Sequence, residues 1–133
     1  QVSVFAEGRT PINTTFENNI FFFEGKGEWG KNATGINTVF RNNLYYNITP
    51  HSSDTQPFLA DPGFIKPVSA GSNINLKTMD ALRGYQLQPG SPCINSALPI
   101  ANNGGWDIVK NAVDAAESDI GAFECQVRGD KRP

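Results

Sequence analysis

The chain has little of what marks several common protein classes. Its 133 residues include one His, one Met and two Cys, too few for a metal site rich in Cys and His. Lys and Arg number 11 against 13 Asp and Glu, which leaves no basic surface for the phosphates of nucleic acid. No apolar run approaches the ~18 residues of a membrane-spanning helix, and no charged-then-apolar leader opens the sequence. We therefore predict neither a nucleic-acid partner nor a membrane span.

Two sparse features favour export from the cell. Three Asn-x-Ser/Thr sequences, at Asn13, Asn32 and Asn47, are acceptors for N-linked glycans in a secreted protein. The cysteines Cys93 and Cys125 lack metal-ligand spacing and favour one disulfide bond, with two buried free thiols as the alternative. We therefore predict a secreted, extracellular glycoprotein. Because the chain does not begin with Met, we expect its start to be processed or excised.

The most informative feature is an internal repeat, in which residues 10–19 recur as residues 34–43. The two copies are identical at seven of ten positions, at a constant offset of 34 − 10 = 24 in residue number. The likeness continues from residues 20–22 to 44–46, where a branched aliphatic residue precedes two aromatic residues in both copies. A fixed period between about 20 and 50 residues is the mark of a solenoid, in which each unit buries a face against the next.

The residue types in the repeat predict strands. Ile, Val, Thr, Phe and Tyr suit a pleated sheet, whereas helical repeats are longer and favour Ala, Leu and Glu. Leucine-rich repeats need a recurring Leu pattern that this chain lacks. The fold class predicted is therefore all-β, a parallel β-helix in which each coil is one copy of the repeat.

The repeat also predicts which residues lie over one another. Coils stacked at ~4.8 Å would place Phe16 over Phe40 and the Asn pair at 18–19 over the pair at 42–43. The Asn pairs fall where the chain must turn, and Asn tolerates the left-handed backbone of such corners. We expect their amides to form a ladder.

The rest of the chain divides by composition. Phe64 follows Phe40 at the same offset, so residues 54–67 are expected to form a degenerate last coil. The predicted organisation is β-helix coils over 1–71, an irregular C-terminal cap of the same domain over 72–125, and a tail over 126–133. No cap precedes the first coil, and open strand edges pair readily with other strands. Upstream coils of the same precursor or a self-associating chain are therefore predicted partners.

Three segments give the chain a resemblance to a known group: Ala60–Phe64, Tyr85–Asn95 and Asp119–Glu124, which have the sequences ADPGF, YQLQPGSPCIN and DIGAFE. Over residues 10–124 the chain resembles the C-terminal ends of secreted proteins of the pectin-lyase-like superfamily. The resemblance implies a right-handed parallel β-helix. Members include polysaccharide lyases, glycoside hydrolases, esterases and non-enzymatic adhesins, so the fold does not fix the reaction. Because their catalytic groups usually lie on central coils, the resemblance implies that the main catalytic coils lie outside this chain.

The loop between the two copies carries the candidate substrate-binding residues. Trp29 could stack on a sugar ring, while Glu24, Lys26 and Glu28 could bond hydroxyls or pair with uronate groups. The alternative is a solvated loop whose Trp folds back on the coil. Glu24 and Glu28 could also stand ~5 to 9.5 Å apart, as glycoside hydrolysis requires, but the sequence does not fix their separation. The catalytic residues are therefore unassigned.

Other polar residues have weaker functional interpretations. His51 is the single histidine, and no pattern supports a Ser-His-Asp arrangement around it. Five Asp residues are possible calcium ligands without the spacing of a calcium-binding loop, so structural turns explain them better. These residues are Asp54, Asp61, Asp107, Asp114 and Asp119. We predict no cofactor, with calcium as the open alternative.

The sequence therefore supports two hypotheses of function. The first is the C-terminal portion of a secreted polysaccharide-degrading enzyme, a glycoside hydrolase or a polysaccharide lyase. The second is a non-catalytic module that binds glycans or acts in cell-surface interaction. Both predict a polysaccharide or glycan as the partner.

Overall fold

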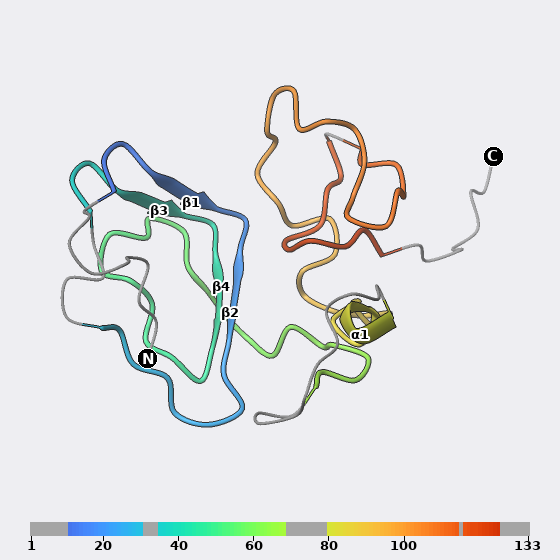
Figure 1. The fold of residues 1–133 in the computed structure, drawn as a ribbon, viewed down its shortest axis with the longest axis horizontal. Helices are drawn as coiled ribbons and strands as arrows, with labels where there is room; N and C mark the ends of the chain where they lie inside the picture. Colours follow the sequence, from blue (N-terminus) through green and yellow to red (C-terminus); the bar gives the residue numbers. More distant parts are fainter. Residues whose placement is uncertain (1–10, 31–34, 69–79, 115, 126–133) are drawn as a thin grey trace. The chain divides into compact units, whose positions relative to one another are not determined.

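The computed structural model describes residues 11–30, 35–68, 80–114 and 116–125. The chain divides into two compact units, Gln1–Pro62 and Gly63–Pro133 (Figure 1). The division falls ahead of the predicted boundary after residue 71. The predicted tail over 126–133 and the sequon at Asn32 lie outside the described residues.

The described part of the first unit is built from short parallel strands. They are β1 (Thr15–Glu17), β2 (Ile20–Phe22), β3 (Val39–Arg41), β4 (Leu44–Tyr46) and β5 (Phe58–Leu59). One sheet pairs β1 with β3, and the other has the order β2-β4-β5 (Figure 1). Phe16 lies opposite Phe40 and Ile20 opposite Leu44, so the predicted offset between the two copies is confirmed.

Aromatic rings stack along this register. The rings of Phe16 and Phe40 have centroids 4.8 Å apart and an interplanar angle of 17°. Those of Phe21 and Tyr45 are 5.2 Å apart at 10°. Side chains alternate across a strand, so aromatic residues at equivalent positions of the two copies lie over one another. Phe40 and Tyr45 are buried in the core.

Asparagine makes the corners between the strands. Asn18 and Asn42 follow β1 and β3 with φ angles of 57° and 52°, in the left-handed region that Asn tolerates better than most residues. Asn42 Nδ2 donates to Asn18 Oδ1 at 2.8 Å, and Asn19 Nδ2 donates to Asn43 Oδ1 at 3.1 Å. The predicted amide ladder is confirmed. The buried amide of Asn43 also donates to Phe16 C=O and to Asp54.

The third strand departs from the predicted spacing. Leu44 pairs with Phe58, so the offset in residue number falls to 58 − 44 = 14, and Asp54 forms a parallel bridge with Phe40. The expectation that Phe64 continues the register of the repeat is therefore wrong, because Phe64 forms an antiparallel bridge with Leu87 in the second unit. A turn in which Asp54 N–H donates to His51 C=O at 2.9 Å returns the chain early.

The second unit is mostly irregular in its described residues. Its helix is a single turn, α1 (Asp80–Arg83). Buried side chains form its core: Leu87, Cys93, Ile120 and Phe123. Loop backbones without a ladder need other acceptors, and the carboxylates of Asp107 and Asp119 supply them. Among the described residues no helix is long and apolar enough to cross a membrane.

Candidate functional site

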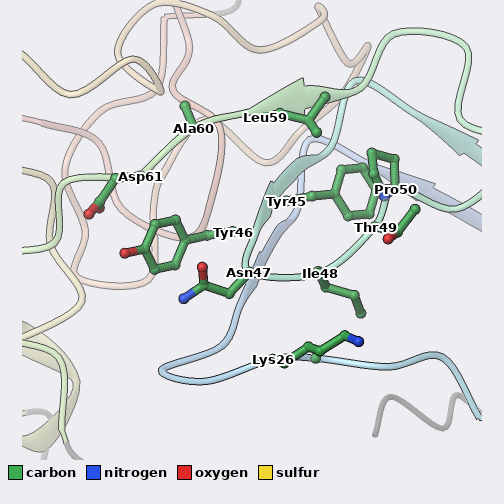
Figure 2. A pocket seen from close by; sticks show the side chains of 11 residues that line it. Lys26, Tyr45, Tyr46, Asn47, Ile48, Thr49, Pro50, Leu59, Ala60 and Asp61 are labelled. Carbon is green, nitrogen blue, oxygen red and sulfur yellow. The ribbon is translucent and has the colours of Figure 1, made fainter.

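An open groove beside β4 and β5 is the candidate site. Its volume is about 570 Å³, within the range of small-molecule sites. Figure 2 shows that Tyr45 and Tyr46 point to opposite sides of β4, with Lys26 on the loop that follows β2. The lining residues are Lys26, Gly27, Tyr45, Tyr46, Asn47, Ile48, Thr49, Pro50, Leu59, Ala60 and Asp61. We call this site the β4 groove.

The short third strand explains why the β4 groove exists. β5 pairs with Leu44 and Tyr45, and its register ends before Tyr46. On its other side Tyr46 stacks on Phe22, with centroids 5.2 Å apart and an interplanar angle of 8°. The segment from Tyr46 to Pro50 therefore runs on past the end of the β5 register and lines the groove.

The β4 groove combines apolar and polar groups. Tyr46 contributes a half-buried ring, and Leu59 is 70% exposed at the rim. Lys26 supplies an ammonium group and Asp61 a carboxylate, both on exposed residues. An aromatic face with a few polar groups around it is the usual composition of a small-ligand site.

Asn47 occupies the turn at the end of β4. Its φ is 57°, and its Nδ2 donates to the backbone oxygen of Phe23 at 2.9 Å. The bond follows the ladder pattern, since Phe23 and Asn47 are separated by the same offset as the Asn pairs. Asn47 is exposed and lines the groove, so this sequon is accessible.

Trp29 packs on the strands rather than standing in the open with the charged residues of its loop. Its ring makes edge contacts with Phe21, Phe40 and Tyr45 at centroid distances of 5.3, 5.8 and 6.3 Å. Its Nε1 donates to Thr49 C=O at 2.8 Å. Stacking on a sugar would require the ring to leave these contacts.

Of the three charged residues predicted to bind substrate beside Trp29, one lines the β4 groove. Glu24, Lys26 and Glu28 are all exposed. Lys26 lines the β4 groove, whereas Glu24 and Glu28 are not among the lining residues. Of the predicted binding residues, Lys26 is the one that the structure brings into the groove. Tyr46, Leu59 and Asp61 were not predicted as binding residues, although alternation along β4 indicates that one of the two tyrosines faces outward.

The Asp54 carboxylate forms hydrogen bonds within the first unit. Its Oδ2 accepts from Asn43 Nδ2 at 2.8 Å and from Tyr45 Oη at 2.7 Å. Burial disfavours the Asp54 charge, but these bonds and the backbone N–H of Gln56 outweigh it and lower the Asp54 pKa. Burial, with the bond to Asp54, raises the pKa of Tyr45. The pair is a structural hydrogen-bond network.

His51 is also held by packing. Its ring stacks on Phe40 at 4.1 Å and 13°, and its Nδ1 lies 2.8 Å from Ser53 Oγ. Burial lowers the pKa of His51, and the nearby Asp54 charge opposes this. Because the Asp54 carboxylate bonds Asn43 and Tyr45, it does not orient the imidazole as an acid–base triad requires.

The acidic residues of the second unit bond backbone. Asp119 accepts from the N–H groups of Asn95 at 2.8 Å and Cys125 at 2.6 Å. Asp107 accepts from four donors, one of them the N–H of Glu124 at 3.0 Å. Within the described residues no group of three or more His, Cys, Asp or Glu could hold a metal ion.

Two further candidate calcium ligands are Asp114 and Asp61. Asp114 Oδ1 accepts from the N–H of Ala116 at 2.9 Å. Asp61 lines the β4 groove in the first unit. The five candidate residues are therefore distributed over turns and the groove.

Among the described carboxyl groups of the second unit, Glu124 has the largest pKa shift. Burial raises its pKa to about 7, and the charges of Asp119, Asp107 and Asp114 add to the effect. No sequence pattern indicated this, because the four residues approach through loops without a repeat.

The remaining predicted modification sites are the two cysteines and the sequon at Asn13. Cys93 is a buried free thiol and Cys125 a partly exposed one, so the predicted disulfide is not present in the structure and stays a prediction. Asn13 is exposed, and its Oδ1 accepts from Asn37 Nδ2 at 3.1 Å.

Comparison with known families gives no matching model, and comparison with curated proteins gives no similar sequence.

Proposed function

We propose that this chain is the end portion of a secreted right-handed parallel β-helix of the pectin-lyase-like kind, and that its β4 groove binds a glycan. The β-helix interpretation is supported by parallel strands that pair at the offset of the sequence repeat and by asparagine ladders at the corners. The terminal segments that resemble the superfamily support the same interpretation.

One observation carries the glycan interpretation. The β4 groove is lined by an aromatic residue, Tyr46, and by the polar residues Lys26, Asn47 and Asp61. Sugars present apolar ring faces and hydroxyl edges, which match an aromatic surface surrounded by donors and acceptors. The groove is open, so it suits one segment of a longer saccharide.

Binding fits the described residues better than catalysis does. Glycoside hydrolysis generally uses two carboxylates across the scissile bond. Among the lining residues of the β4 groove, Asp61 is the single carboxylate. The polysaccharide-degrading function predicted from the resemblance would therefore depend on carboxylates other than those that line the groove.

Titration of the ¹⁵N-labelled chain with a panel of plant and microbial oligosaccharides tests the proposal. We expect a binding saccharide to shift the amide signals of residues 46–49 and 59–61. Tyr46→Ala and Lys26→Ala should each weaken affinity by roughly tenfold, about 1.4 kcal/mol. Trp106→Ala is the matched control, because Trp106 is 59% exposed and belongs to the second unit.

Two outcomes would contradict the proposal. One is no binding to any saccharide of the panel. The other is binding that Trp106→Ala weakens as much as Tyr46→Ala does. Assays for new reducing ends and for unsaturated products, run on the same panel, detect hydrolase or lyase activity.

A further inference from the structure

We propose that Asn47 carries an N-linked glycan whose first sugars lie in the β4 groove, so that modification of this one residue closes the groove to other saccharides. The regulatory part of this inference rests on the proposed function. Its structural part, a self-glycan in the groove, stands on the position of Asn47.

The sequon lies within the groove itself. Asn47 and Thr49, the acceptor and the hydroxyl residue of the sequon, both line the groove, and both are exposed. Figure 2 shows Asn47 next to Tyr46, at the turn that follows β4. Because Asn47 lines the groove, we expect a sugar joined at its Nδ2 to begin there.

The hydrogen bond that Asn47 already makes is compatible with glycosylation. Its Nδ2 donates to Phe23 C=O at 2.9 Å. A side-chain amide nitrogen carries two hydrogens, so one can be replaced by the sugar while the other keeps this bond. The fixed amide and a φ of 57° hold the attachment point in place.

The chemistry of attachment balances with a lipid-linked oligosaccharyl pyrophosphate as the donor. The bond from Asn47 Nδ2 to the sugar C1 forms, and the bond from C1 to the pyrophosphate oxygen breaks. The amide loses one proton to a base of the transferring enzyme, and the pyrophosphate leaves with the electron pair.

A tethered sugar competes strongly for a weak site. A ligand joined by a short tether has an effective concentration of about the millimolar range. A groove of even millimolar affinity is therefore occupied by its own glycan to a large extent. A free saccharide of equal affinity must exceed that concentration to displace it. A weak, open site is thus closed by a tethered sugar.

Asn13 provides the internal comparison. It is exposed and in a sequon, but it is not among the lining residues of the groove. The ladder bond at this corner uses its Oδ1, which accepts from Asn37 at 3.1 Å. A glycan on Asn13 should therefore leave saccharide binding unchanged.

The test uses the full chain secreted from a eukaryotic host and the same chain made without glycosylation in bacteria. Thr49→Ala removes the Asn47 sequon and retains the Asn47 side chain, and Thr49→Ser keeps the sequon. Thr15→Ala removes the Asn13 sequon as the matched control. Peptide mass spectrometry gives occupancy, and nuclear Overhauser contacts between the glycan N-acetyl group and the Tyr46 ring give its location.

We expect Asn47 to be occupied and its glycan to contact Tyr46. The secreted parent, Thr49→Ser and Thr15→Ala should each bind a free saccharide at least about twofold more weakly than the same chain made in bacteria, whereas Thr49→Ala should bind equally in both forms. An unoccupied Asn47, an absence of Tyr46 contacts, or equal affinities of the secreted and bacterial parent would each overturn the inference. If the bacterial chain binds no saccharide, the proposed function fails, and the Tyr46 contacts still decide where the glycan lies.

Discussion

At the scale of the residue, Asp54 shows how a side-chain ladder can end. Asn19 donates to Asn43, and Asn43 donates in turn to Asp54. An amide both donates and accepts, whereas a carboxylate only accepts. Asp54 therefore receives the last donor of the ladder and, at the same oxygen, the hydroxyl of Tyr45.

Asp54→Ala should lower the free energy of unfolding by about 1 to 3 kcal/mol, because it leaves the buried donors of Tyr45 and Asn43 without this acceptor. Asp54→Asn should have a smaller effect, since its amide oxygen can still accept. Urea unfolding measures both. Glu28→Ala is the control, because Glu28 is exposed and should change stability by less than ~0.5 kcal/mol. Equal effects of Asp54→Ala and Glu28→Ala would contradict the role given to Asp54.

The two thiols differ in their surroundings. Burial raises the pKa of Cys93 to about 11, although Ser91 opposes the shift by a hydrogen bond. Asp119 bonds the backbone of Asn95 and of Cys125, so it draws the two cysteine segments together. We predict that oxidation joins Cys93 and Cys125, with loss of two hydrogens detected by intact mass before and after reduction. An unchanged mass in protein oxidised by glutathione disulfide would refute the pairing.

At the scale of the element, the corners decide how the strands stack. Asn42 is 4% exposed, and its left-handed backbone and its amide both serve the corner. Glycine would keep the backbone conformation and lose the amide bond, whereas alanine would lose the bond and add strain.

Asn42→Ala should therefore be less stable than Asn42→Gly by roughly 1 kcal/mol, the strain of a β-carbon in this conformation. Both variants should be less stable than the parent, because the ladder bond to Asn18 is lost. Thermal and urea unfolding of the three proteins give the differences. Alanine and glycine variants of equal stability would show that the left-handed corner is not kept in solution.

The elements that are repeated could be predicted from the sequence, and those that are not repeated were missed. Residues 10–22 and 34–46 carry the same pattern, so their register and corners could be inferred. The return of the chain at Asp54 has no copy elsewhere, and its shorter offset follows from a local turn. Because β5 has no copy elsewhere, the lining of the groove was equally hidden, whereas the packing of Trp29 on the strands agrees with the alternative in which this side chain folds back on the coil.

At the scale of the whole molecule, the two units respond to acid in opposite directions. The pKa of His51 is lowered from 6.5 in the first unit, so its contribution is present above pH 6.5 and is lost as the pH falls. The pKa of Glu124 is raised from 4.5 to about 7 in the second unit. Its contribution is present below pH 4.5 and is lost as the pH rises through 7.

Acidification from neutral pH to about pH 5 should therefore weaken protection of the Tyr45 amide and strengthen protection of the Ile120 amide. Hydrogen exchange at matched intrinsic rates measures both. Glu124→Gln should abolish the response at Ile120 and leave that at Tyr45. Parallel responses in both units, or an Ile120 response that survives Glu124→Gln, would contradict the assignment.

The β4 groove lies beside the paired strands β4 and β5, so the most direct measurement is the nuclear Overhauser spectrum of β2, β4 and β5. Backbone contacts from Phe58 to Leu44 and from Leu59 to Tyr45 are the predicted result. Contacts between the rings of Phe64 and Phe40, with none between β4 and β5, would contradict it. In that case a full-length third copy would cover the groove.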